Sequence, residues 1–260
     1  MNVAAAQAPG MGRTHGTDIP ASGPGRAVLE VEHETVYDYA APVAVSHHRL
    51  HLRPRDGQGQ RLLAFEQRID PAPDHLEEHL DAFGNPSCHV EIWKPHSRLA
   101  ARTLSRVEVV AAPSLDPSAS PAWEDVCEAL RYAPAARFEP AVEFVAPSPH
   151  VPRLPELAEW ARASASPRRP VAELALELMQ RVHQDFAYAA RSTDVDTPLA
   201  AAFAQRRGVC QDFAHLMIGA LRSLGLPARY VSGYLLTHRP DGAVLVGADA
   251  SHAWVQAGWP

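Results

Sequence analysis

Hydrophobic and polar residues alternate along much of the first half of the chain. In residues 27–39 (AVLEVEHETVYDY), apolar side chains recur at nearly every second position, which is typical of a strand with one buried face. The same alternation recurs in four further segments, at residues 41–54, 61–71, 88–94 and 104–110. Turn-forming residues such as Gly84-Asn85-Pro86 separate these segments. Short strands with regular punctuation predict a β-sandwich-like domain over residues 26–112.

The last hundred residues have a different period. In residues 170–186, an apolar stripe at helical spacing (Val171, Leu174, Leu178 and Val182) follows a proline at a position that suits the start of a helix. A second helical pattern begins near residue 209 and stops at Gly225. Three alternating segments come next, at residues 228–236, 243–246 and 250–257. Helices followed by strands predict an α+β core over residues 156–260.

Two stretches lack either period. Residues 1–25 are rich in Ala, Gly and Pro, and we expect a disordered lead-in. Residues 113–155 are rich in Pro, Ser and Ala and predict a linker, within which residues 123–132 suit a short helix. The N-terminal sequence has no apolar core of a secretory signal, and no apolar run approaches the length of a membrane helix. These features predict a cytoplasmic protein with no membrane partner.

Charge and cysteine usage narrow the class of protein. The formal net charge is -6, which argues against a nucleic-acid partner, because such binders normally carry a basic surface. The three cysteines, Cys88, Cys127 and Cys210, are far apart and form no CxxC pair. They indicate neither a disulfide framework nor a zinc site, so we expect a reducing compartment, no metal and no cofactor. The composition does not indicate an oligomeric state.

Cys210 has the setting of a reactive thiol. It follows Gly208-Val209 and opens the second helical pattern. The start of a helix offers unpaired N–H groups and partial positive charge, which stabilise a thiolate and can hold an oxyanion. At about 100° per residue, Met217 lies nearly above Cys210, so the thiol is expected at the buried edge of the helix. Gly208 is expected to permit a sharp bend. A free cysteine can equally be a small buried hydrophobe.

His252 supplies the second half of a possible site. It lies in ASHAWVQ, on a predicted strand beside the cysteine helix. A thiol nucleophile needs a base, usually a histidine, that the fold and not the sequence brings close. Trp254 alternates onto the same strand face, where it can wall a cleft or fill the core. Because the chain has 14 histidines, this spacing is by itself also compatible with chance.

A family resemblance strengthens the pairing. GVCQDFAHLMIGALRSLGLPARYVSGYL followed by DASHAWVQ closely resembles the core of bacterial transglutaminase-like proteins, and VYDYAAPVAVSHHRLHLRPRDGQGQ with DAFGN resembles the β-domain that often precedes that core. The resemblance covers about residues 28–105 and 165–256. It implies a papain-like or transglutaminase-like α+β core with Cys210 as nucleophile and His252 as general base. It also implies acyl transfer or hydrolysis on protein or peptide amides through a thioester.

The resemblance leaves the third catalytic residue open. In the family an aspartate normally follows the histidine on the next strand, and this sequence reaches Pro260 without such a segment. The core is therefore expected to be incomplete, with weak or no activity, since disabling the orienting acid of a serine triad costs on the order of 10⁴ in kcat. A non-catalytic module that binds a peptide or a partner protein is the alternative reading.

Other acids in the chain have no positive argument as substitutes. Asp249 is three residues before His252, and an odd separation on a strand places the two side chains on opposite faces. Asp212 is about 200° around the helix from Cys210 and is expected to point away. Three further aspartates lie in predicted loops and stay open as candidates: Asp194, Asp196 and Asp241.

For the other histidines that we considered, the sequence gives no good argument for a metal-binding or catalytic role. HLEEH at residues 75–79 matches a zinc-peptidase pattern, but that chemistry needs one helical face, and this segment lies in a strand-rich region. His47-His48 lies on a predicted strand, where neighbouring side chains face opposite ways and cannot form a clamp. His215 is about 140° around the helix from Cys210 and is not its natural base. Arg206-Arg207 could support a thiolate, although solvated arginines are the commoner case.

Overall fold

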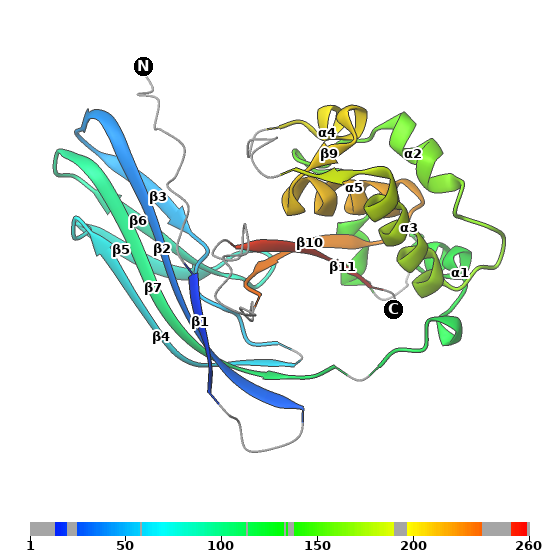
Figure 1. The fold of residues 1–260 in the computed structure, drawn as a ribbon, viewed down its shortest axis with the longest axis horizontal. Helices are drawn as coiled ribbons and strands as arrows, with labels where there is room; N and C mark the ends of the chain where they lie inside the picture. Colours follow the sequence, from blue (N-terminus) through cyan, green and yellow to red (C-terminus); the bar gives the residue numbers. More distant parts are fainter. Residues whose placement is uncertain are drawn as a thin grey trace. The chain divides into compact units, whose positions relative to one another are not determined.

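Two compact units make up the computed structural model, which describes residues 14–19, 25–57, 59–112, 114–132, 134, 138–189, 197–235 and 251–258. The first unit comprises residues 1–113 with 233–251, and the second comprises residues 114–232 with 252–260 (Figure 1). The first contains strands and the second contains all the described α-helices. The expected α+β class, with a strand-rich N-terminal region, is confirmed.

Seven strands form two antiparallel sheets in the first unit. They are β1 (Thr14–Ile19), β2 (Arg26–Val43), β3 (Ser46–Leu50), β4 (Gln60–Asp70), β5 (His75–Leu80), β6 (Pro86–Ile92) and β7 (His96–Val110). One sheet has the order β1-β2-β7-β4 and the other has the order β3-β6-β5. The long strands β2 and β7 pair from Arg26 opposite Val110 to Asp38 opposite Arg98.

An apolar cluster lies between these sheets. Strand β6 contributes every second residue to it, namely Cys88, Val90 and Ile92, each at most 6% exposed. They pack with Leu99 of β7, and Ile69 of β4 packs against the cluster. This period of two is what a strand requires when one face is buried and the other is open. The intervening residues of β6 therefore lie on the face turned away from this core.

Two strands depart from the sequence-based prediction. Residues 14–19, expected within the disordered lead-in, form β1, in which Thr14 lies opposite His33 and Ile19 opposite Val28. A strand of this kind is held by backbone hydrogen bonds to β2, which require no apolar period. Residues 75–80 form β5, whose six residues are all exposed. The expectation that HLEEH does not form a helix is confirmed. The strand itself was not predicted, because an edge strand with no buried face shows no alternation of apolar and polar residues.

The second unit combines short helices with small strand pairs. Its α-helices are α1 (Trp123–Ala129), α2 (Pro155–Arg162), α3 (Val171–Asp185), α4 (Leu199–Gln205) and α5 (Cys210–Ser223). Its strands are β8 (Ala187–Tyr188), β9 (Arg207–Gly208), β10 (Ala228–Gly233) and β11 (His252–Ala257), and η1 (Pro117–Ala119) and η2 (Pro140–Phe144) are 3-10 turns. Strands β8 and β9 pair in parallel, and β10 pairs with β11.

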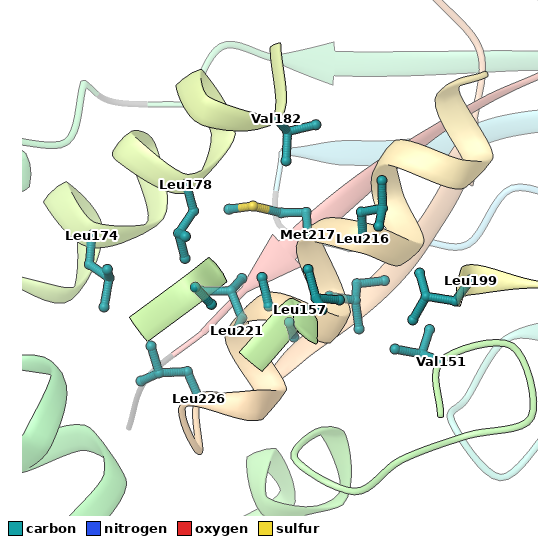
Figure 2. Packing of buried hydrophobic residues seen from close by; sticks show 14 of the residues in the cluster. Val151, Leu157, Leu174, Leu178, Val182, Leu199, Leu216, Met217, Leu221 and Leu226 are labelled. Carbon is teal, nitrogen blue, oxygen red and sulfur yellow. The ribbon is translucent and has the colours of Figure 1, made fainter. Parts of the chain in front are cut away.

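Helix α5 is at the centre of this unit. Leu216 and Leu221 are completely buried and face the apolar stripes of α2, α3 and α4 (Figure 2). Gly219 is on the same helix, and a β-carbon built there would lie 2.8 Å from Cδ2 of Leu157 on α2. Glycine at this position allows α2 and α5 to pack closely. A helix packed on several sides has a fixed position and direction, so its first residue is fixed as well.

The segment expected as a linker contributes to the second unit. Val126 and Leu130, in and directly after α1, and Val151 are buried in the same cluster as α5. The isolated apolar residues of this Pro-rich stretch gave no period, yet tertiary packing buries them. The predicted domain boundaries themselves stay a prediction. No helix in the described part of the chain is long and apolar enough to cross a membrane.

Candidate active site

Cys210 is the first residue of α5. The preceding residue, Val209, is extended, with φ of -109° and ψ of -179°, and forms the N-cap. The thiol is half-buried. It therefore lies beside the N–H groups of the first helical turn, at the positive end of the helix. Met217 is buried in the core on the same helix, which agrees with the predicted phase.

Asp212 and Gly208 determine how the chain enters this helix. The Asp212 side chain is buried, and its Oδ2 accepts a hydrogen bond of 2.8 Å from the backbone N–H of Val209. A β-carbon on Gly208 would lie 2.6 Å from that Oδ2 and 2.7 Å from the Asp212 Cβ. Glycine is therefore needed at position 208 because any side chain there would collide with Asp212. From the sequence, this glycine was instead expected to permit a sharp bend of the backbone. Asp212 has a structural role that the sequence reasoning did not assign.

The short strand pair β8–β9, which ends just before Cys210, is itself held by further contacts. Gly208 lies opposite Tyr188 in the β8–β9 pair, and its carbonyl accepts a 3.0 Å hydrogen bond from the N–H of Ala189. Arg206, in the left-handed conformation at the end of α4, places its guanidinium over the ring of Phe203 at 4.2 Å from the centroid. This arginine serves packing. Together these contacts fix residues 206–209 directly before the first residue of α5.

His252 is the first residue of β11, which packs against α5. Its Nε2 atom is buried and has no hydrogen-bond partner among the described residues. Trp254 shares its strand face, as the period of two predicts, and the two ring centroids are 6.3 Å apart. Nδ1 of His33 and Nε2 of His48 are also buried without a partner among the described residues, so it is the position of His252 on the strand packed against α5 that makes it the candidate base.

Tyr230 on β10 is a polar group beside α5 that the sequence reasoning missed. Burial raises the pKa of its hydroxyl, and the negative charges of Cys210 and Asp212 raise it further. The ring of Tyr230 lies 5.3 Å from that of His215 on α5. The signal available in the sequence was weak, because a tyrosine on an apolar strand is usually a packing residue.

His215 belongs to a stack of rings. It lies 5.7 Å from the His150 ring, nearly parallel to it, and 5.3 Å from the Tyr230 ring. Burial lowers the pKa of His215, and the neighbouring His150 lowers it further. The neutral imidazole is thus favoured and packed between aromatic rings. That His215 is not the base for Cys210 stays a prediction.

The other two thiols have a different environment. Burial raises the pKa of both Cys88 and Cys127, with Gln67 opposing the shift at Cys88 and Glu124 adding to it at Cys127. The Cys127 Sγ also donates to the Leu224 carbonyl at 3.2 Å. Both thiols are kept protonated, which suits the structural roles expected of them. Four acids considered as orienting groups lie outside the described residues: Asp194, Asp196, Asp241 and Asp249.

Comparisons with known proteins agree with this architecture. Residues 29–108 match the bacterial transglutaminase-like N-terminal region, and residues 158–259 match the transglutaminase-like superfamily. An uncharacterised protein of Mycobacterium bovis is 37% identical over 243 residues, which cover 93% of this chain and 76% of that protein. An uncharacterised protein of Mycobacterium leprae is 32% identical over 238 residues, covering 89% and 80%.

A solved structure has a similar fold. The crystal structure of a protein from Cytophaga hutchinsonii, proposed to be a cysteine protease, aligns with a TM-score of 0.68 at 19% sequence identity. The alignment covers 88% of this chain and 72% of that one. At this identity the likeness concerns the fold, and it includes both the strand-rich region and the helical core.

Proposed function

Because the chain belongs to the bacterial transglutaminase-like family, we propose that it is a cysteine-dependent enzyme that transfers or hydrolyses acyl groups of protein or peptide amides. One observation carries this proposal. Cys210 opens helix α5, and the strand packed against α5 begins with His252, whose Nε2 atom is buried and has no hydrogen-bond partner among the described residues. A nucleophile at a positive helix end and an unengaged base on the adjoining strand are the two parts that acyl transfer needs.

The proposed first step forms a thioester. The Nε2 atom of His252 takes the proton of the Cys210 thiol, and the sulfur attacks the carbonyl carbon of a carboxamide or peptide bond. The N–H groups at the start of α5, that of Cys210 first, would bind the oxyanion that develops. When the tetrahedral intermediate collapses, the C–N bond breaks, and the imidazolium returns its proton to the departing ammonia or amine.

The proposed second step releases the acyl group. Water or an amine attacks the thioester carbonyl, with His252 taking its proton, and the C–S bond breaks as the imidazolium returns that proton to the departing sulfur, which restores the thiol and the neutral base. Water gives hydrolysis and an amine gives cross-linking, so the acceptor decides between the two outcomes. Tyr230, whose ring lies 5.3 Å from that of His215 on α5, is proposed to line the acyl pocket. We assign no orienting acid among the described residues. A protein or peptide substrate and a cytoplasmic location stay predictions.

Competitive alkylation tests the pairing directly. Under native conditions a limiting amount of iodoacetamide should modify Cys210 on the order of tenfold or more faster than Cys88 or Cys127, measured by peptide mass spectrometry. His252→Ala should abolish this preference. His183→Ala is the matched control, because His183 is an exposed histidine on α3 and its removal should change nothing.

The outcomes separate the two readings of the site. Equal labelling of the three thiols, or selective labelling that survives His252→Ala, would contradict the catalytic pairing and favour a module that only binds peptides. A positive result should be followed by assays of ammonia release from glutamine-containing peptides, in which Cys210→Ala should be inactive. This second assay distinguishes a reactive thiol from a complete catalytic site.

A further inference from the structure

The outward face of the small sheet β3-β6-β5 gathers histidines from distant parts of the chain. His89 and Glu91 lie on β6 between the core residues, so their side chains are on the face turned away from the apolar cluster. His47 of β3 is the register partner of Glu91. On the other side of β6, His75 of β5 is also opposite Glu91. Three strands thus place imidazoles around one carboxylate.

The distances within this group are short. Oε1 of Glu91 lies 3.0 Å from Nε2 of His89 and 3.5 Å from Nδ1 of His47. One donor atom from each of the three residues lies within 4.8 Å of the other two. The two imidazole rings are stacked, with centroids 6.2 Å apart and an interplanar angle of 27°. A single carboxylate oxygen therefore faces both histidines.

The two separations from Oε1 of Glu91, of which the shorter is a hydrogen bond to His89 in this structure, are close to what a tetrahedral ion requires. With ligand bonds of about 2.0–2.1 Å, the donor atoms of a tetrahedral site are about 3.4 Å apart. The two measured separations fall on either side of that value. The donor set is two imidazoles and one carboxylate, which suits Zn²⁺ and similar transition ions, whereas Ca²⁺ and Mg²⁺ prefer oxygen ligands alone.

A fourth residue orients the carboxylate. The indole N–H of Trp93 donates to Oε2 of Glu91 at 3.0 Å, which leaves Oε1 turned toward the histidines. Trp93 is itself anchored, because its backbone N–H donates to Oδ2 of Asp74 at 2.8 Å. Residues that hydrogen-bond to a metal ligand and orient it are typical of metal sites in proteins, and their loss commonly weakens metal binding about 10–100-fold.

We propose that His47, His89 and Glu91 form a binding site for a divalent transition-metal ion of the zinc type on the outward face of the β3-β6-β5 sheet. The ion would join β3 to β6, and its fourth position would be open to solvent or to His75. The side chain of His47 is 56% exposed and that of Glu91 is 22% exposed, so an ion can enter. No metal was expected from the sequence, because the cysteines form no CxxC pair. This group could not be found from the sequence, because His47 and His89 are 42 positions apart and only strand pairing unites them.

Cobalt and zinc binding to the full chain tests this site. All variants should carry Cys210→Ser, so that the reactive thiol cannot hold the metal. After chelation and dialysis, calorimetric titration with Zn²⁺ should show one equivalent bound, and Co²⁺ should give the intense visible absorption of a tetrahedral complex. His89→Ala and Glu91→Gln should weaken binding by at least about 100-fold, and Trp93→Phe by about 10–100-fold.

His79→Ala is the matched control. His79 is an exposed histidine of the same HLEEH segment, and it lies opposite Ser87 in the ladder, away from Glu91. It should bind like the parent, and circular dichroism should show that every variant keeps its fold. No saturable binding by the parent at micromolar metal would overturn the proposal. Unchanged binding in both His89→Ala and Trp93→Phe would also overturn it, since the metal would then be held by other groups.

Discussion

Replacing Gly208 by alanine should destabilise the second unit through one specific collision. The new methyl group would lie 2.6 Å, 2.7 Å and 2.9 Å from Oδ2, Cβ and Cγ of Asp212. Because the Asp212 side chain is only 3% exposed, it cannot swing into solvent without giving up its place. Overpacking of this kind costs about 1–3 kcal/mol. Displacing the carboxylate also breaks its 2.8 Å bond to the Val209 N–H, and a hydrogen bond to a charged group contributes about 1.5–3 kcal/mol.

A double-mutant cycle isolates this contact. Gly208→Ala alone should lower the free energy of unfolding by about 2–4 kcal/mol, and Asp212→Ala alone by about 1.5–3 kcal/mol. In the Asp212→Ala background the carboxylate is gone, but the alanine Cβ still lies 2.7 Å from the new methyl group, so Gly208→Ala should cost only about 1–2 kcal/mol because no hydrogen bond to Val209 is left to break. The coupling energy between the two substitutions should therefore be on the order of 1–3 kcal/mol.

Urea denaturation followed by helical circular dichroism is the appropriate assay, because all described α-helices belong to the second unit. The variants should shift the midpoint at constant slope. Gly258→Ala is the control, since a β-carbon there meets no atom within 4 Å. Losses that simply add in the double variant would refute the reasoning, because the Gly208 substitution would then act on something other than Asp212.

Two further predictions concern stability. Gly219→Ala should lower the free energy of unfolding in urea by about 1–3 kcal/mol, because the new methyl group would lie 2.8 Å from the buried side chain of Leu157. Helix propensity alone would make alanine stabilising at this position, so a more stable variant would contradict this packing. Burial lowers the pKa of His33 below its unfolded value of about 6.5, so its contribution to stability is complete above that pH and is lost as the pH falls from about 6.5 through the lowered folded pKa. In urea titrations across this range, His33→Gln should flatten the dependence of stability on pH, and an unchanged slope would assign the effect to other groups.

Local periodicity determined most of the secondary structure. The stripe Val171, Leu174, Leu178 and Val182 predicted a helix, and all four residues are buried on α3. Alternation likewise located β2, and the helix expected near residue 209 begins at Cys210. These features could be predicted because the pattern that forms each element is contained within that element, and one buried face fixes its period.

The sequence also identified the two residues of the candidate active site and the family. Cys210 was singled out because its position relative to a helix start can be inferred locally, and His252 because the motif around it resembles the family core. Their chemistry depends on details that no local pattern contains. The burial of the His252 Nε2 atom, the contact of Tyr230 with His215 and the contact of Gly208 with Asp212 all arise from packing between elements.

Only the tertiary structure decided which distant residues share a face. Strand β1 and the exposed strand β5 have no internal pattern, because backbone hydrogen bonds to a neighbouring strand hold them. The group of His47, His89 and Glu91 depends on the register between β3 and β6, and a shift of one residue would turn His47 to the other face. Sequence thus determined the elements and the candidate nucleophile and base, because those follow from neighbours along the chain. Register and packing decided the surroundings of these groups, because they join residues that the chain itself keeps far apart.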